Sequence, residues 1–150
     1  MKPLSFLLLF GTVLSFISCK TNQLNKAGKA HGRWEFQDSL GTQIYKYGGR
    51  YKNGIERGKW VYYLNGKLTR KEKYRKNISY NQIFHENGRV SSQGKSQLDL
   101  SATEVHWYYF GDWEYFDENG RLTAIKTYEN GKQIRSKDLS APAKTLSEKP

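Results

Sequence analysis

The sequence predicts an all-β protein built from repeated β-hairpins in an extended antiparallel meander. Three observations support this fold class. Five Asn-Gly pairs recur along the chain, and Asn-Gly favours type I′ hairpin turns because both central residues of such a turn need positive φ. Aromatic residues make up 15% of the chain, and 14 glycines stand against 3 prolines, which suits short strands joined by tight turns. A Gly-x-Trp sequence also occurs three times.

The first 18 residues have the pattern of an export signal. Lys2 precedes an apolar segment from Leu4 to Ile17, which is short for a transmembrane span. The segment ends in Phe16-Ile17-Ser18-Cys19, and Cys19 is the only cysteine of the chain. This end resembles the lipobox of bacterial lipoproteins, in which the cysteine is acylated and begins the mature chain. The resemblance implies a lipoprotein signal peptide over residues 1–18 and lipidation at Cys19.

Lipidation and plain secretion both export the protein, and lipidation is the favoured interpretation. Several acyl chains anchor a protein stably, since each buried CH₂ contributes about 0.8 kcal/mol. Lys20 follows the cysteine, in place of the Asp that resembles an inner-membrane retention signal. We therefore expect a lipid-anchored protein of the bacterial cell envelope, at the outer membrane rather than the inner. Residues 19–30 are small and polar and predict a tether between the lipid and the domain.

Residues 31–134 carry the repeats and form the predicted domain. Trp34, Trp60 and Trp113 of the Gly-x-Trp sequences are 26 and 53 residues apart, and each is followed two positions later by another aromatic residue. Side chains two positions apart on a strand share a face, so each Trp and its following aromatic are expected together. The glycines of the Asn-Gly pairs are 12, 22, 32 and 11 residues apart. This spacing predicts hairpin units of about 22 residues, each in contact mainly with its neighbours.

The repeated unit is Gly-x-Trp-x-Tyr, followed by Asn-Gly-Lys-Leu and then Tyr-x-Asn-Gly, and its clearest copy is Gly58–Leu68. This unit resembles the bacterial variant of the MORN repeat, whose members are often described as antitoxin-like. The resemblance covers residues 31–134 and is weakest over 94–103. It implies one extended, twisted sheet of hairpins without a catalytic pocket common to the family, and it assigns no binding residue to this chain.

Two segments depart from the repeat. Residues 94–103 have no turn signal at the expected place and predict an irregular loop, after which Glu104–Phe110 resumes as a strand. Asn77 stands near the position at which a further turn is expected. Residues 135–150 are rich in Lys, Ser, Ala and Pro without any period, and they predict a disordered tail.

The sequence gives little support to catalysis. The three histidines lack metal-ligand spacing, and the chain contains no Gly-rich phosphate loop, nucleophile elbow or zinc signature. Acidic residues near the turns recur with the repeat, as turn-solvating residues do, so glycoside hydrolysis by a carboxylate pair is weakly supported. We expect no enzymatic activity, no cofactor and no metal.

Candidate binding residues are aromatic residues expected opposite the tryptophans and basic residues that follow Leu68. They are Tyr63, Arg70, Lys71, Lys73, Tyr108 and Phe116. The net charge of +11 favours anionic partners such as lipid headgroups, acidic glycans or nucleic acid. The same charge also keeps an aromatic-rich sheet soluble. Because an exported protein does not meet nucleic acid in the cell, nucleic acid is not an expected partner.

The favoured function is that of a non-enzymatic envelope lipoprotein, which binds a protein or an anionic surface through one face of its sheet. One alternative is an immunity or antitoxin-type protein that neutralises an exported toxin. Another is a glycan-binding module that stacks sugars on exposed aromatic rings. All three hypotheses assign binding rather than catalysis to the repeat domain.

Overall fold

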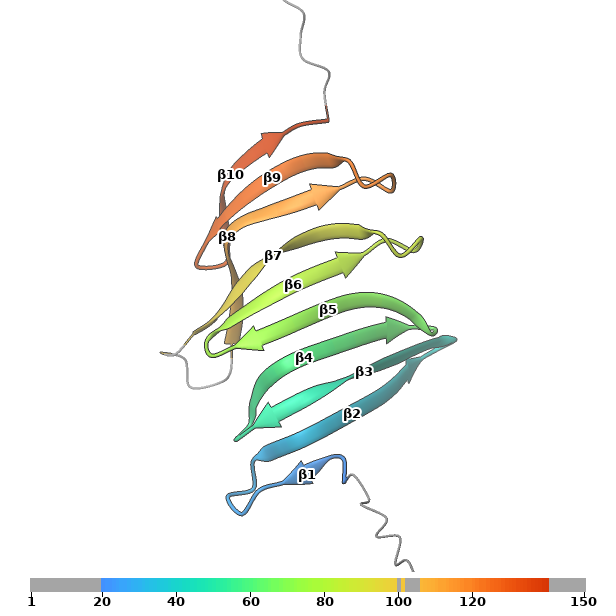
Figure 1. Cartoon of the computed structure of the whole chain (residues 1–150), viewed down its shortest axis with the longest axis vertical. Coiled ribbons are helices and arrows are strands. Elements are labelled where there is room, and N and C mark those ends of the chain that lie inside the picture. Colours follow the sequence, from blue (N-terminus) through green and yellow to red (C-terminus); the bar gives the residue numbers. More distant parts are fainter. Residues whose placement is uncertain (1–19, 100, 102–105, 141–150) are drawn as a thin grey trace, which may run out of the picture.

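A computed structural model describes residues 20–99, 101 and 106–140 of the chain. Within these residues all regular elements are strands, and ten of them form one antiparallel sheet in sequence order (Figure 1). The strands are β1 (Gln23–Leu24), β2 (Ala30–Leu40), β3 (Gln43–Lys52), β4 (Ile55–Leu64), β5 (Lys67–Arg75), β6 (Ile78–Phe84), β7 (Val90–Asp99), β8 (His106–Phe116), β9 (Leu122–Glu129) and β10 (Lys132–Asp138). The predicted all-β meander is confirmed. The described residues contain no helix that is long and apolar enough to cross a membrane.

Three segment boundaries differ from those expected from the sequence. β1 pairs with β2, so part of the expected tether joins the sheet. β7 runs to Asp99 and pairs with β6 and β8, so residues 94–99 form a strand and not a loop. β10 extends into the expected tail and ends at Asp138. Pairing with a neighbouring strand satisfies the backbone groups of these segments, whose composition alone gives no strand signal. The signal peptide, Cys19 and residues 141–150 lie outside the described residues.

The Asn-Gly turns take two forms. Both residues have positive φ, as a type I′ turn requires, at Asn53-Gly54, Asn65-Gly66 and Asn130-Gly131. In the loops that follow β6 and β8 only the glycine, Gly88 or Gly120, has positive φ. The turn expected near Asn77 is present, and Lys76 adopts a φ of 55° in it.

The two faces of the sheet differ in chemistry. The aromatic face carries Trp34, Trp60 and Trp113, each with the aromatic residue two positions later, as the alternation predicts. Trp60 and Trp113 are fully buried, although the described residues form a single sheet with no second layer. The opposite face, here called the basic face, carries exposed lysine and arginine side chains from β2 to β7.

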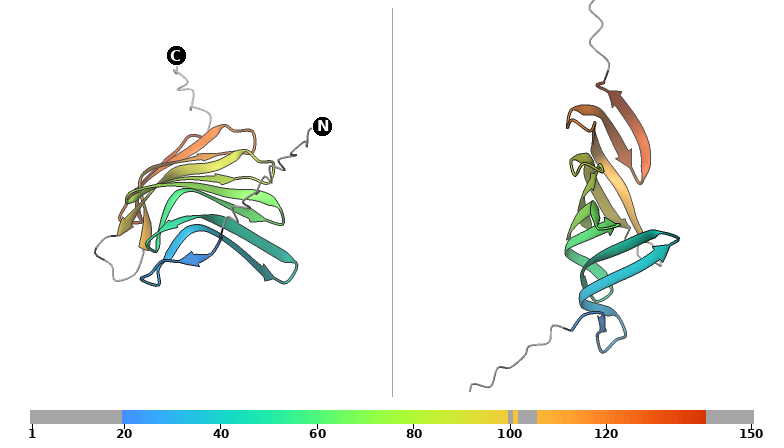
Figure 2. Two further views of the ribbon diagram at one scale, coloured as in Figure 1. Left: turned by 60° about the horizontal axis from the view of Figure 1, so that its bottom comes forward. Right: turned by 90° about the vertical axis from the view of Figure 1, so that its right-hand side faces the viewer.

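A curl of the sheet buries part of the aromatic face. In Figure 1 the beginning of β8 passes behind the end of β5 and the beginning of β6, and Figure 2 shows the resulting twist from the side. The ring centroids of Tyr74 on β5 and Trp107 on β8 are 4.9 Å apart, although two strands lie between them. The small side chains of Ser79 and Ser96, which oppose each other on those two strands, are buried beneath this contact. Small residues on β6 and β7 therefore allow the two rings to meet.

The Gly-x-Trp sequences of β4 and β8 form bulges. Gly58 and Gly111 have φ values of 66° and 67°, a conformation that favours glycine. At each bulge three residues of one strand oppose a single glycine of the preceding strand, Gly49 or Gly94. The bulge increases the local twist, and it places the tryptophan above that glycine.

The tryptophan and the opposed glycine form a matched pair in both bulges. A Cβ on Gly49 would lie 2.3 Å from the Trp60 ring, and one on Gly94 would lie 2.3 Å from the Trp113 ring. Each indole nitrogen donates to the carbonyl of the residue after the glycine, at 3.1 Å in the first pair and 3.0 Å in the second. The same packing thus occurs between β3 and β4 and again between β7 and β8.

A second bulge accompanies each Asn-Gly-Lys/Arg-Leu-Thr sequence. Thr69 is the extra residue between β4 and β5, and Thr123 is the extra residue between β8 and β9. The hydroxyl of each donates to a carbonyl of the preceding strand, to Tyr62 or Tyr115, at 3.1 Å. The threonine of the repeat therefore stabilises an irregularity in the ladder.

Candidate binding surface

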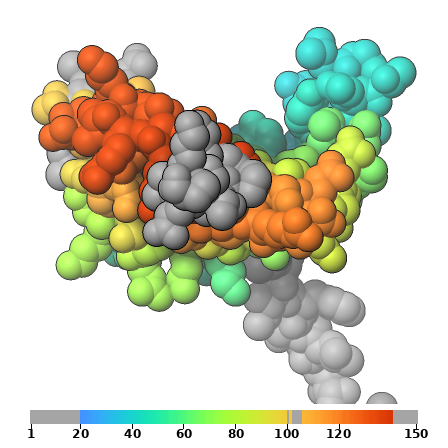
Figure 3. Space-filling model, turned by 90° about the horizontal axis from the view of Figure 1, so that it is seen from above, coloured from blue at the N-terminus to red at the C-terminus, as the bar shows by residue number. Residues whose placement is uncertain are grey.

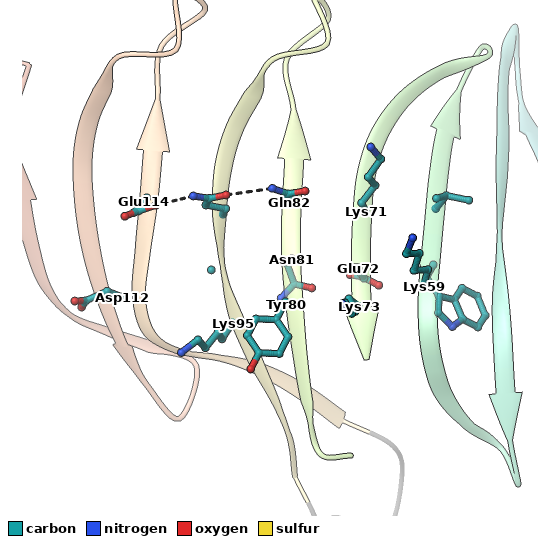
Figure 4. A pocket seen from close by; sticks show the side chains of 14 residues that line it. Lys59, Lys71, Glu72, Lys73, Tyr80, Asn81, Gln82, Lys95, Asp112 and Glu114 are labelled. Carbon is teal, nitrogen blue, oxygen red and sulfur yellow. Dashed lines mark hydrogen bonds between the residues drawn. The ribbon is translucent and has the colours of Figure 1, made fainter. Parts of the chain in front are cut away.

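The basic face presents a row of side chains across four adjacent strands. Lys59 on β4 lies directly opposite Lys73 on β5, Lys73 opposite Tyr80 on β6, and Tyr80 opposite Lys95 on β7. All four side chains are exposed, and Figure 4 shows them on this face. The Lys95 Nζ lies 5.9 Å from the centroid of the Tyr80 ring. Since neighbouring strands are about 4.8 Å apart, the row spans about 14 Å.

A second row of cations crosses the first three long strands. Arg33 on β2 lies opposite Arg50 on β3, and Arg50 lies opposite Arg57 on β4. Arg33 forms an ion pair with Glu35, with Nη2 2.6 Å from Oε1. This pair is exposed, so it contributes little to stability. The two rows meet on β4, where Arg57 and Lys59 are two residues apart on the same face.

Most of these cations have no acidic partner. Among the described residues, Arg33 is the only member of the two rows that takes part in an ion pair. Like charges directly opposite each other on neighbouring strands are destabilising. The Arg50–Arg57 and Lys59–Lys73 pairings therefore leave positive charge without an acidic partner along one face.

Two shallow hollows lie along the basic face and together extend from β2 to β8. One has a volume of about 740 Å³, and its cations are Lys59, Lys71, Lys73 and Lys95. The other has a volume of about 870 Å³, and its cations are Arg33, Lys46, Arg50 and Lys59. Because Lys59 and Val61 line both hollows, the two form one continuous surface.

The β8 end of this surface is acidic. Gln82 donates to Gln93 at 3.2 Å, and Gln93 donates to Glu114 at 2.7 Å, which gives a hydrogen-bonded chain across β6, β7 and β8 (Figure 4). Asp112 lines the same end and accepts a bond from Thr127 at 2.6 Å. These carboxylates limit the region that attracts anions to β2–β7.

Three of the six residues expected to bind lie on this surface. Lys71 and Lys73 are exposed on β5 and line the first hollow. Tyr63 is exposed on β4, directly opposite Lys46, and lines the second hollow. The structure therefore brings these predicted residues onto one face.

Arg70 points to the other face, away from Lys71 and Lys73. It lies opposite Tyr62, and its guanidinium carbon is 3.9 Å from the centroid of that ring. Its Nε is 3.4 Å from Oε1 of Glu72, whose side chain is buried. Successive residues of a strand alternate between faces, so the run that begins at Arg70 divides between the two sides of the sheet.

Tyr108 and Phe116 do not line the hollows. Tyr108 is half-buried opposite Gln97. Phe116 is half-buried opposite Leu122, and its carbonyl oxygen is 2.9 Å from Nε2 of His85. Both residues lie away from the cation rows, so the structure gives them no part in this surface.

Lys59, Tyr80 and Lys95 were missed as candidate residues. Lys59 lies within a conspicuous repeat sequence that was interpreted as structural, and the other two lie in segments without a basic run. Strand alternation started from Trp60 places Lys59 on the opposite face, and the hairpin pairing then brings Lys73, Tyr80 and Lys95 into line. The sequence signal for these residues was thus the alternation of faces along each strand, and not the number of basic residues in a segment.

The middle of the aromatic face departs from the repeat. One row of residues crosses this face from β3 to β9. Its members are Gly49, Trp60, Glu72, Asn81, Gly94, Trp113 and Lys126. Glu72 stands where the other repeats have glycine, and Asn81 stands where they have tryptophan. In the central repeat, the tryptophan packed over a glycine is therefore replaced by a buried pair of polar side chains, Glu72 and Asn81.

The buried polar pair has a complete set of hydrogen-bond partners. The Tyr62 and Tyr74 hydroxyls donate to Oε2 of Glu72 at 2.7 and 2.5 Å. With the Asn81 amide oriented to satisfy both ends, its nitrogen lies 3.3 Å from Oε1 of Glu72 and its oxygen accepts from Ser96 at 2.9 Å. Burial, reinforced by the Glu72 carboxylate, raises the pKa of both Tyr62 and Tyr74. The polar side-chain atoms of Glu72 and Asn81 are thus occupied by partners within the sheet.

His85 and the acidic turn residues have structural contacts. The loops after β6 and β8 are joined by the contact of His85 with the Phe116 carbonyl and by a bond from Asn87 to the Glu118 carbonyl, at 2.9 Å each. The Asp117 carboxylate accepts from the backbone of Asn119 and Arg121, and these bonds lower its pKa. In the described part of the chain, no three His, Cys, Asp or Glu side chains are grouped so as to hold a metal ion.

Comparisons with known protein families, with curated proteins and with solved structures give no match to this chain. Function is therefore inferred from the arrangement of side chains on the sheet, since a fold by itself does not specify a function. The basic face is the surface with the clearest chemical character.

Proposed function

We propose that this chain is a non-enzymatic binding module of the bacterial cell envelope, anchored by a lipid at Cys19, that binds an anionic polymer or surface through its basic face. The observation that carries this proposal is the alignment of like charges across strands. Arg33, Arg50 and Arg57 are directly paired, and so are Lys59 and Lys73. Such pairs reduce the stability of the free sheet. A bound polyanion would attract both cations of a pair and so offset the repulsion between them.

The dimensions of the surface favour an extended ligand. The cations run from β2 to β7, which is five interstrand spacings or about 24 Å. Exposed Tyr63 and Tyr80 lie among the cations and offer rings and hydroxyls for additional contacts. A chain or surface with regularly spaced negative charges would contact several cations at once, so its affinity would exceed that of a single small anion.

The location and the family are parts of the same proposal. The apolar segment that ends at the sole cysteine, Cys19, supports a lipid anchor. The meander of hairpins, with the Gly-x-Trp and Asn-Gly sequences at equivalent places, supports membership of the MORN-type family.

Binding of long-chain polyphosphate, titrated at several salt concentrations, tests the proposal. The double variant Lys59→Gln/Lys73→Gln removes two central cations, and Lys132→Gln/Lys137→Gln removes the same charge from exposed positions on β10. We expect the first variant to bind about tenfold more weakly at low salt. Its slope of log affinity against log salt should fall by about two, since each lysine that contacts a phosphate contributes about one. An equal loss in the β10 variant would overturn the proposal, because net charge alone would then explain the binding.

A further inference from the structure

The tip of the β2–β3 hairpin exposes apolar side chains at the edge of the molecule. Leu40 is 74% exposed, Ile44 is 44% exposed and Tyr45 is 36% exposed. Leu40 and Ile44 flank the short turn at Gly41 and Thr42. In Figure 3 this tip, drawn in cyan, stands out from the central strands. Three exposed apolar side chains thus lie within six positions at one end of this hairpin.

The apolar side chains at the tip point in two directions. Ile44 lies opposite Ser39, and Leu40 lies opposite Gln43. Because residues alternate along a strand, Leu40 and Ile44 stand on opposite faces of the hairpin. A docked protein would cover only one of these faces, whereas an apolar medium that surrounds the tip would cover both. The geometry therefore favours lipid over a protein partner.

The backbone of Ile44 and the hydroxyl of Tyr45 have hydrogen-bond partners within the protein. The Ile44 N–H donates to Oδ1 of Asn65 at 2.8 Å, and the Asn65 N–H donates to the Ile44 carbonyl at 2.9 Å. The Tyr45 hydroxyl donates to Gln43 at 2.5 Å. Unsatisfied polar groups are costly in an apolar medium. These hydrogen bonds lower the cost of moving Ile44 and Tyr45 out of water.

We infer that the β2–β3 tip inserts into the interfacial layer of a lipid bilayer, with Leu40 and Ile44 among the upper acyl chains and Tyr45 near the headgroups. Amphipathic segments of this kind reach about 5–10 Å into the boundary between headgroups and acyl chains, and tyrosine is enriched at that depth. Asp38 and Lys46 flank the tip with opposite charges, so its insertion needs no anionic lipid. It is thus independent of the polyanion binding proposed for the basic face.

Site-specific fluorescence on the full chain tests this inference directly. In a Cys19→Ala background, Leu40→Cys is labelled with a nitrobenzoxadiazole fluorophore and mixed with phosphatidylcholine vesicles whose acyl chains carry a nitroxide quencher. The control is Ile134→Cys on β10, where the native side chain is 55% exposed. We expect the label at position 40 to be quenched and the label at 134 to stay unquenched. No quenching at 40, or equal quenching at both positions, would overturn the inference.

A second set of variants separates tip insertion from other contacts with the vesicle. With the label at position 40, Ile44→Ser should weaken partitioning about tenfold, since each buried CH₂ contributes about 0.8 kcal/mol. Leu24→Ser, which changes a side chain that is 61% exposed on β1, should leave it unchanged, as should Lys59→Gln/Lys73→Gln. If Leu24→Ser weakens the signal as much as Ile44→Ser, general surface hydrophobicity and not the tip drives binding, and the inference is wrong.

Discussion

The Trp60 ring occupies the space above Gly49 in which a side chain would otherwise lie. A Cβ at position 49 would come within 2.3 Å of the ring, and the indole nitrogen donates to the next carbonyl along β3. Trp113 and Gly94 repeat this relationship four strands later. The single-layered sheet of the described residues thus buries Trp60 and Trp113 by placing each one over a glycine of the preceding strand.

The first prediction concerns these glycines. Gly49→Ala and Gly94→Ala should each lower the free energy of unfolding by about 2–3 kcal/mol or more, because the tryptophan ring has to move off the strand. Gly66→Ala, at a turn position with a φ of 78° and open space for a Cβ, should cost only about 1 kcal/mol. Urea denaturation followed by tryptophan fluorescence measures all three. Equal losses at the three positions would contradict the packing described for Trp60 and Trp113.

The second prediction concerns the central repeat. Asn81→Trp alone should be strongly destabilising, because the Glu72 side chain occupies the space that glycine leaves open in the other repeats. Adding Glu72→Gly should recover part of the loss by recreating the ring-on-glycine pair, although the Tyr62 and Tyr74 hydroxyls lose their acceptor. A double-mutant cycle should show a favourable coupling of at least about 1 kcal/mol. Additive effects would mean that the three repeats are not equivalent at this row.

The third prediction is a loss of stability at alkaline pH. Burial raises the pKa of Tyr51 to about 12, and burial beside Glu72 raises the pKa of Tyr62 and Tyr74 further. These raised pKa values stabilise the folded state when the pH is below 10.0, the ordinary pKa of tyrosine. The stabilisation is lost as the pH rises through the pKa values of the folded state. The free energy of unfolding should therefore decline from about pH 10 upward.

Urea denaturation between pH 7 and 11.5 measures this decline. The variant Tyr62→Phe/Tyr74→Phe should be less stable at neutral pH, because Glu72 loses two donors. It should also show a shallower alkaline decline than the wild type, because two of the responsible groups are gone. If the free energy of unfolding falls with pH as steeply in the variant as in the wild type, groups other than Tyr62 and Tyr74 cause the decline.

The fourth prediction concerns the turn between β5 and β6. Lys76 adopts a φ of 55°, which is strained for a side chain with a Cβ, so Lys76→Gly should raise the free energy of unfolding by about 0.5–1 kcal/mol. Asn77→Gly is the matched control, because position 77 does not have positive φ, and it should be neutral or destabilising. Thermal unfolding of the two variants provides the comparison. A higher melting temperature for Asn77→Gly than for Lys76→Gly would show that the turn conformation is assigned wrongly.

Much of the fold follows from local sequence signals. Asn65-Gly66 specifies its turn through backbone preferences of the two residues, and the two-residue spacing of Trp60 and Tyr62 specifies a shared face. The same dipeptide at Asn119 behaves differently, because the Asp117 carboxylate accepts bonds from the backbone of Asn119 and Arg121 and so stabilises a longer loop. Side-chain competition of this kind modifies a turn without removing it.

The parts that sequence reasoning missed depend on contacts between distant strands. The role of Gly94 becomes visible only when Trp113, 19 residues later in the chain, lies on top of it. Likewise, Tyr74 meets Trp107 across two strands because the serines between them are small. Arg70 and Lys71 lie on opposite faces because successive residues of a strand alternate. In the linear sequence, however, they look like members of one basic run. Cross-strand register, which sets which cations are neighbours, is established by the whole set of turns and bulges.

The most direct test of the central claim is a lysine footprint of the full chain with and without long-chain polyphosphate. Limited acetylation followed by mass spectrometry reports the reactivity of each exposed lysine. The basic-face proposal predicts that polyphosphate protects Lys59, Lys73 and Lys95, while Lys132 and Lys137 on β10 react as before. Uniform protection of all five lysines, or protection confined to β10, would contradict it.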